Sequence, residues 1–159
     1  MQAAPNAMDY NQALAYLDRF TNYERELRYP YDGWAMNLER VRGLIEPLDH
    51  PDRQLKIVHI AGSKGKGSVA AMIESMARAA GLKTGLYTSP HLLDFKERIR
   101  IAGRTVSEAE VAAAVERLVP AVEAVHARAD LGQVTYFEIL TAMAFFAFAA
   151  AGVELAVME

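Results

Sequence analysis

The spacing of apolar residues along the chain predicts five helices. In residues 9–20 aromatic residues and leucines recur at the period of an amphipathic helix. Ser107 is a suitable N-cap for a later helix, in which Pro120 introduces a kink or a division. Residues 136–151 are apolar almost throughout, as in a helix buried in a core. The predicted helices are residues 9–20, 37–48, 69–80, 108–129 and 136–151.

Short apolar runs between these helices predict strands. Residues 55–61 and 153–159 are rich in β-branched and aliphatic residues, which is typical of buried strands. Residues 83–88 form another run, and residues 98–102 alternate before a turn at Gly103. A glycine-rich loop joins the first run to a helix and the next strand follows, so we expect a βαβ unit. The predicted fold class is α/β with a mostly parallel sheet and flanking helices.

Composition and charge narrow the classes of protein that fit. The 159 residues are 52% hydrophobic and 23% charged, a balance that excludes a disordered chain and suits one domain. The net charge of −3 argues against nucleic-acid binding through bulk positive charge, and the lack of cysteine excludes disulfides and thiol chemistry. Because residues 1–7 are small and polar, we expect no targeting signal there, and the uncharged residues 139–153 are shorter than the roughly 20 residues of a membrane span.

The loop between the first predicted strand and its helix has the composition of a phosphate-binding loop. It reads Gly-Ser-Lys-Gly-Lys-Gly-Ser over residues 62–68, and glycines there let backbone N–H groups approach phosphate oxygens. Lys66 could reach the outer phosphates and Ser68 could ligate Mg²⁺. The alternative is a surface turn that binds nothing. The spacing departs from G-x-x-x-x-G-K-[ST], because Ile60 replaces its first glycine and Gly67 follows the lysine, which argues against a small P-loop kinase.

Six segments together resemble the folylpolyglutamate synthase/dihydrofolate synthase family, whose members are ATP-dependent amide ligases related to the Mur ligases. The resemblance follows family order from Asp9 to Glu159 and implies the fold of the Mur-ligase central ATPase domain. The segments are NLERV (37–41), HIAGSKGKGSV (59–69), YTSPHL (87–92), ERIRIAG (97–103), TYFE (135–138) and VELAVME (153–159).

The resemblance also implies a reaction. A pteroate or folate carboxylate attacks the γ-phosphate of ATP, and the amino group of L-glutamate displaces phosphate from the resulting acyl phosphate. The implied substrates are dihydropteroate or tetrahydrofolate, L-glutamate and ATP, with Mg²⁺ and a monovalent cation such as K⁺. The family further implies a cytoplasmic protein, monomeric when full-length, with no nucleic-acid or membrane partner. Whether it starts or extends the glutamate chain is left open.

Roles are carried over by position. Lys66 and Glu159 are the expected catalytic residues, and Ser68, Ser89 and Glu159 the expected metal ligands, although Ser89 could simply cap a strand end. Tyr136 and Phe137 could equally be core aromatics. Arg98 and Glu97 would order the loop between the nucleotide and folate pockets or, alternatively, form a surface ion pair. The implied ATP-binding residues are Gly62, Ser63, Lys64, Gly65, Lys66, Gly67 and Ser68. The implied folate- or pteroate-binding residues are Thr135, Tyr136, Phe137, Glu138 and Arg98.

The family pattern continues beyond Glu159 with a metal-binding histidine, a modified lysine and a C-terminal domain that completes the glutamate and ATP sites. We therefore predict an extension over residues 1–8 and the N-terminal part of an ATP-binding domain over 9–159. By itself this portion is expected to be inactive, with the apolar residues 139–153 and an unpaired sheet edge exposed. The alternatives are a non-catalytic nucleotide-binding remnant and a small metabolite kinase.

Overall fold

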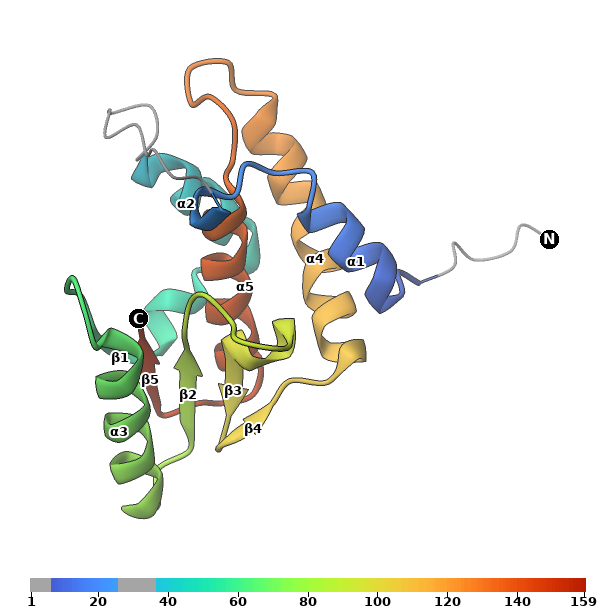
Figure 1. Cartoon of the computed structure of the whole chain (residues 1–159). Coiled ribbons are helices and arrows are strands. Elements are labelled where there is room, and N and C mark those ends of the chain that lie inside the picture. Colours follow the sequence, from blue (N-terminus) through green and yellow to red (C-terminus); the bar gives the residue numbers. More distant parts are fainter. Residues whose placement is uncertain (1–6, 26–36) are drawn as a thin grey trace. The chain divides into compact units, whose positions relative to one another are not determined.

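The computed structural model describes residues 7–25 and 37–159, which form helices and one five-stranded sheet (Figure 1). Residues 1–6 of the predicted extension and residues 26–33 of a predicted loop lie outside this part. The elements are α1 (Tyr10–Leu17), η1 (Tyr23–Arg25), α2 (Leu38–Ile45), η2 (Glu46–Leu48), η3 (Pro51–Gln54), β1 (Lys56–His59), α3 (Lys66–Ala79), β2 (Thr84–Tyr87), η4 (Phe95–Arg98), β3 (Ile99–Ile101), β4 (Arg104–Thr105), α4 (Glu108–His126), α5 (Tyr136–Ala150) and β5 (Leu155–Met158).

These elements belong to two compact units. The helical unit contains the described residues up to Pro47 together with Glu108–Met143. The sheet unit contains Leu48–Ser107 and Ala144–Glu159. Each unit is therefore assembled from two separate stretches of chain, and α5 begins in one unit and ends in the other.

The sheet unit confirms the predicted α/β class with a largely parallel sheet. Its strand order is β1-β5-β2-β3-β4, in which β5 pairs in parallel with both β1 and β2. The two strands of the predicted βαβ unit are thus separated by the last strand of the chain. β3 runs antiparallel to β2, and the short β4 antiparallel to β3.

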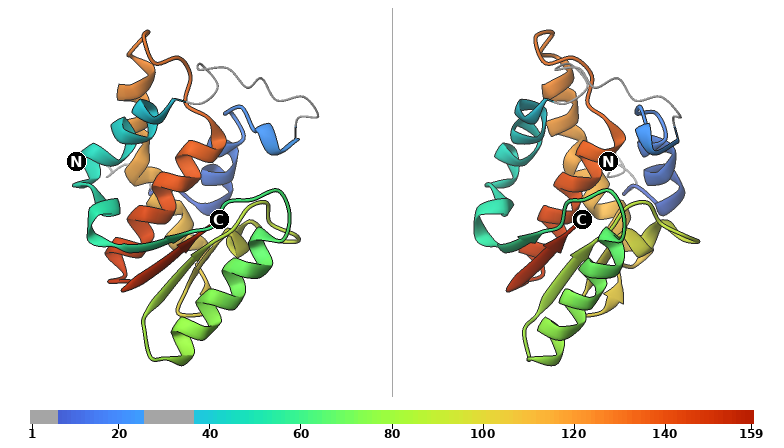
Figure 2. Two further views of the ribbon diagram at one scale, coloured as in Figure 1. Left: turned by 90° about the vertical axis from the view of Figure 1, so that its left-hand side faces the viewer. Right: turned by 60° about the vertical axis from the view of Figure 1, so that its left-hand side comes forward.

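Helices cover the two faces of this sheet, and β2 shows how the faces differ (Figure 2). Successive strand residues point to opposite faces. Leu86 packs with Ala70 of α3 and Val157 of β5 in one buried cluster. At the neighbouring Gly85, an added Cβ would lie 2.7 Å from the Phe148 ring of α5. α3 and the C-terminal part of α5 therefore lie on opposite faces.

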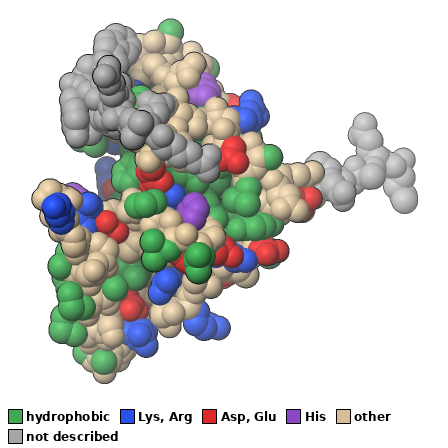
Figure 3. All heavy atoms as spheres, in the orientation of Figure 1, with side chains coloured by type: hydrophobic (Ala, Val, Ile, Leu, Met, Phe, Trp, Pro, Cys, Tyr) green, Lys and Arg blue, Asp and Glu red, His purple; other side chains and the backbone are tan. Residues whose placement is uncertain are grey.

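Two expectations about exposure are wrong. β1 was predicted to be buried, yet Ile57 is 41% exposed, because β1 ends the sheet order and has one partner among the described strands. The apolar helix over most of residues 139–153 is buried, as its pattern predicted, because Ile139, Leu140 and Phe148 are fully buried, so the exposure expected of it in this portion by itself is wrong. Its buried residues up to Met143 belong to the helical unit, and those from Ala144 onward belong to the sheet unit. Exposed hydrophobic side chains gather instead on α3, as Figure 3 shows, and include Met72 and Met76.

In the helical unit α4 packs against both α1 and α2. The approach to α2 is close, since a Cβ at Gly43 would lie 2.7 Å from a Val125 methyl group. Pro120 lies inside α4, which runs undivided from Glu108 to His126. Of the two alternatives predicted for Pro120, a kink or a division, the division is therefore wrong.

Caps account for several helix ends. Asp9 accepts a hydrogen bond from the Gln12 amide in a reciprocal capping box, and Asn37 caps α2. At the end of α3, Gly81 takes φ +90° and donates to the carbonyl of Arg78, while Leu82 donates to Ala77. This is the Schellman arrangement, so the predicted glycine stop at residue 81 is confirmed.

Candidate functional site

The glycine-rich loop has the strand–loop–helix setting expected of a phosphate site. It leaves β1 and enters α3 at Gly65, whose φ of +74° favours glycine. The Gly65 carbonyl accepts the first helical hydrogen bond, from Val69, and no side chain caps the helix. The first N–H groups of α3 and its dipole are thus directed toward the exposed loop. Such a helix end can bind an anion.

Glu159 lies beside this loop. Its side chain is only 8% exposed, and Oε1 lies 3.9 Å from Nζ of Lys66. A Cβ at Gly67 would lie 3.2 Å from Oε2, so the glycine leaves room for the carboxylate. The Ser89 amide lies 3.4 Å from the same oxygen. Four residues from three separate sequence segments therefore meet in the sheet unit.

The loop that follows Ser89 is organised by Glu97. Its carboxylate accepts hydrogen bonds from the amides of Leu92, Leu93 and Asp94, at 2.9, 3.4 and 3.2 Å. The bond from the Leu92 amide is the main cause that lowers the pKa of Glu97 below its ordinary value of 4.5. Leu92 and Leu93 are 89% and 93% exposed. The loop thus presents two apolar side chains on a hydrogen-bonded backbone.

Arg98, the next residue, is buried rather than part of a surface ion pair. Only 2% of it is exposed, and its Nε donates to Nδ1 of His91 at 2.7 Å. Its carbonyl accepts from the Thr88 amide. These contacts tie the end of η4 to the start and the middle of the preceding loop. A direct role of Arg98 in folate binding stays a prediction.

The TYFE segment forms the first turn of α5 in the helical unit. The Thr135 amide donates to Oε2 of Glu138 at 2.7 Å, and the Glu138 amide donates to the Thr135 hydroxyl at 3.3 Å. This is a capping box, a pattern that T-x-x-E before an apolar run signals in sequence. Tyr136 is 3% exposed and donates its amide to Thr21, whereas Phe137 is 44% exposed. Phe137 is therefore the side chain that this turn presents.

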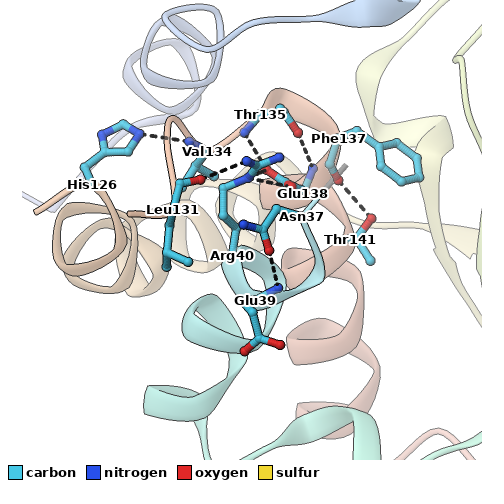
Figure 4. A network of polar contacts seen from close by, with 10 residues as sticks. All are labelled: Asn37, Glu39, Arg40, His126, Leu131, Val134, Thr135, Phe137, Glu138 and Thr141. Atoms are coloured by element: carbon cyan, nitrogen blue, oxygen red, sulfur yellow. Dashed lines mark hydrogen bonds and ion pairs between the residues drawn. The ribbon is translucent and has the colours of Figure 1, made fainter. Parts of the chain in front are cut away.

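Arg40, which the sequence pattern did not assign to the site, forms an ion pair with Glu138 of this turn. Arg40 of α2 is 1% exposed, and its Nε lies 2.8 and 3.0 Å from the two carboxylate oxygens of Glu138 (Figure 4). Its Nη1 donates to the carbonyl of Leu131 at 2.9 Å. His126 accepts a hydrogen bond from the Val134 amide in the same loop. NLERV and TYFE, two segments of the family resemblance, thus meet in one buried network.

The predicted site residues fall into two groups. The phosphate loop, Ser89 and Glu159 lie together in the sheet unit, with Arg98 in that unit, while Thr135–Glu138 lie in the helical unit. Glu138, expected to face a ligand, has a structural part as cap and ion-pair partner. Its direct contact with folate stays a prediction. The sequence pattern did not predict a role for Arg40. The T-x-x-E signature could have shown that the Glu138 carboxylate caps the start of α5 by accepting a backbone hydrogen bond.

The donor set beside the loop suits Mg²⁺. Magnesium typically keeps several waters and is held by one or two carboxylates together with substrate phosphates. Glu159 offers a nearly buried carboxylate there, and Ser68 and Ser89 offer hydroxyl groups. Among the described residues no three His, Asp or Glu side chains cluster as metal ligands. In residues 7–25 and 37–159 no helix has the length and apolarity to cross a membrane.

Comparisons with known proteins extend this description. No family model matches the chain. It is 43% identical over 117 residues to dihydrofolate synthase/folylpolyglutamate synthase of Bacillus subtilis, covering 74% of this chain and 27% of that protein. The corresponding Mycobacterium tuberculosis protein is 39% identical over 138 residues, covering 83% of this chain and 28% of that protein. The chain thus spans little more than a quarter of the length of these relatives.

Solved structures agree with the sequence comparison. Folylpolyglutamate synthase from Thermotoga maritima matches with a TM-score of 0.81 and 34% identity, over 94% of this chain and 32% of that one. The Mycobacterium tuberculosis folylpolyglutamate synthase complexed with ADP also gives 0.81, with 36% identity, over 94% of this chain and 31% of that one.

The fold is accordingly the α/β fold of Mur-type ligases, as the family resemblance implied. The chain belongs to the folylpolyglutamate synthase/dihydrofolate synthase family and corresponds to its N-terminal portion.

Proposed function

We propose that the chain is the nucleotide-binding portion, and part of the folate-binding portion, of an ATP-dependent ligase. That ligase would add L-glutamate to dihydropteroate or to a folylpolyglutamate through an acyl phosphate. The observation that carries the proposal is the meeting of Lys66, Gly67, Ser89 and Glu159 at the end of a strand–loop–helix unit. The proposal is supported by the solved complex of a folylpolyglutamate synthase with AMPPCP and folate, which matches with a TM-score of 0.81 and 34% identity.

Each residue would have a physical part in the reaction. The loop amides and Lys66 would bind the phosphates of ATP and offset charge on the outer ones, which favours attack by a carboxylate. Ser68, Ser89 and Glu159 would hold Mg²⁺, which when bound would supply positive charge at the phosphates. The exposed Phe137 ring would pack against the flat ring system of a pterin. The site would also hold the carboxylate in line with the γ-phosphate, and exclusion of water would protect the acyl phosphate from hydrolysis.

Several finer expectations accompany this proposal. They are the use of Mg²⁺ and a monovalent cation, a monomeric full-length protein without nucleic-acid or membrane partners, and a cytoplasmic location. Because the chain spans 27% of the Bacillus subtilis relative, we expect the 159 residues by themselves to bind nucleotide without turning it over. Ligation would require the remaining parts that the family supplies.

The first test is nucleotide binding by the 159-residue chain, measured by calorimetry with MgADP and a non-hydrolysable ATP analogue. Lys66→Ala should weaken binding by at least about 10-fold, or 1.4 kcal/mol, since the charge opposite the phosphates is lost. Lys56→Ala, which removes an exposed lysine from β1 in the same unit, is the matched control and should leave binding unchanged. Equal effects of the two substitutions would contradict the assignment of Lys66.

A second assay distinguishes the alternatives. A polypeptide that contains this chain and the remaining family segments should incorporate labelled L-glutamate into dihydropteroate or tetrahydrofolate only when MgATP is present. Binding of MgATP without incorporation would favour a non-catalytic nucleotide-binding protein. Transfer of phosphate to a hydroxyl acceptor would instead indicate a kinase.

A further inference from the structure

Arg40 is a buried cation whose contacts converge on one short turn. The guanidinium is 1% exposed, which is rare for arginine unless its charge is paired. It contacts both carboxylate oxygens of Glu138 and the carbonyl of Leu131, so one side chain of α2 holds the loop before α5 and the first turn of α5 (Figure 4). A planar guanidinium fixes the direction as well as the distance of such contacts.

The turn held in this way contains Phe137. Thr135 and Glu138 close the capping box on either side of it, and the Phe137 carbonyl accepts a hydrogen bond from the Thr141 hydroxyl at 2.8 Å. The Phe137 backbone is therefore fixed from both directions along α5, while its ring is 44% exposed. An exposed ring on an immobilised backbone can be presented to a ligand with little loss of conformational entropy.

A buried ion pair contributes little to stability compared with apolar packing, because the desolvation of both charges offsets their attraction. The pair between Arg40 and Glu138 is hydrogen-bonded to the backbone of the turn, at the Thr135 amide, and of its preceding loop, at the Leu131 carbonyl. What it adds is a defined geometry for that turn. The same helix offers a contrast, since Arg42 pairs with Glu39 in an exposed i,i+3 contact within α2 itself.

We propose that Arg40 is a positioning residue for folate or pteroate binding, and that it acts by fixing the first turn of α5 and hence the ring of Phe137. The inference rests on the proposed function, because it takes the ligand to be a flat pterin ring. Arg40 itself is buried behind the turn and acts through Glu138.

The test compares Arg40→Lys with the matched control Arg42→Lys in the full polypeptide that contains this chain. Lysine keeps the charge but cannot contact the Glu138 carboxylate and the Leu131 carbonyl with a planar fork. We expect Arg40→Lys to raise the dissociation constant for dihydropteroate about 10-fold, with the constant for MgADP unchanged. Arg42→Lys should alter neither constant. Far-UV circular dichroism and the thermal midpoint establish that each variant is folded.

A double-mutant cycle with Phe137→Leu separates positioning from a general structural effect. Phe137→Leu alone should weaken dihydropteroate binding about 10-fold, but by less than about 3-fold when Arg40 is already lysine. If Arg40→Lys does not fold, Glu138→Gln, which preserves the side-chain shape, takes its place in the cycle. Strictly additive effects, or unchanged binding in Arg40→Lys, would overturn the positioning role alone. A wild-type polypeptide that binds MgADP but no pteroate would overturn the folate proposal and this inference together.

Discussion

Adding one methyl group at Gly67 should weaken the proposed nucleotide binding without lowering the stability of the sheet unit. Gly67 lies in the first turn of α3, where alanine is the better helix former by up to about 1 kcal/mol. The substitution Gly67→Ala should therefore leave the free energy of unfolding unchanged or raise it slightly. The same methyl group would lie 3.2 Å from Oε2 of Glu159, closer than the 3.4 Å at which ordinary van der Waals contact begins.

The consequence is a small displacement of the Glu159 carboxylate. Oε2 must move by a few tenths of an ångström from the new methyl group, which alters its contact with the Ser89 amide and the place of the carboxylate beside Lys66. Mutating the groups that orient a metal ligand typically costs 10- to 100-fold in metal affinity or activity, and Glu159 is a proposed Mg²⁺ ligand. We expect the affinity for MgADP to fall about 10-fold, or 1.4 kcal/mol, in calorimetry, with a thermal midpoint that does not fall.

A cycle with Glu159→Gln tests the cause. If Gly67→Ala acts by displacing Glu159, it should weaken MgADP binding much less in a Glu159→Gln background than in the wild type. Unchanged affinity in Gly67→Ala, or a loss of stability above about 1 kcal/mol, would refute the reasoning. Equal effects in both backgrounds would show that the methyl group acts on the loop itself.

Three further changes test the fold and the loop. Gly85→Ala places a methyl group 2.7 Å from the Phe148 ring and should lower the free energy of unfolding by about 1–3 kcal/mol in urea titrations, a loss that Phe148→Leu should partly relieve. Because the pKa of Glu97 is lowered in the folded state, the hydrogen bond from the Leu92 amide to its carboxylate stabilises the fold above pH 4.5 and is lost as pH falls through the folded-state pKa. Hydrogen-exchange protection of the Leu92 amide, corrected for intrinsic exchange rates, should therefore decrease below pH 4.5. Asp9→Ala removes the cap of α1 and should cost about 1 kcal/mol in thermal unfolding, whereas Asp9→Asn should cost less.

Local features of the fold were predictable because their causes are local. Apolar periodicity located the helices, and the glycine stop at Gly81 follows from the left-handed conformation that ends α3. The exposure of β1 was not predictable, since an apolar run looks the same at the edge and in the middle of a sheet. The pair of Arg40 and Glu138 joins residues 98 positions apart, a separation at which no local pattern specifies a partner.

The residues of the proposed phosphate site lie together because of the strand order. β5 lies between β1 and β2, and Met158 is in register with both His59 and Tyr87. The carboxyl ends of three parallel strands therefore lie at one edge of the sheet, where ligands of α/β proteins usually bind. The glycine-rich loop follows the first strand, Ser89 follows the second and Glu159 follows the third. Three distant sequence segments meet because their strands share one register.

That register is specified by side-chain size. Gly85 and Ala156 are paired on one face of the sheet, the face that Phe148 contacts at Gly85, whereas Leu86 and Val157 are paired on the other. A slip of β5 by one residue would exchange the faces, so that Val157 would be directed to the side of Phe148. The same slip would turn the residue after β5 to the opposite face as well. Small residues facing one aromatic ring therefore help to keep the Glu159 carboxylate beside the phosphate loop.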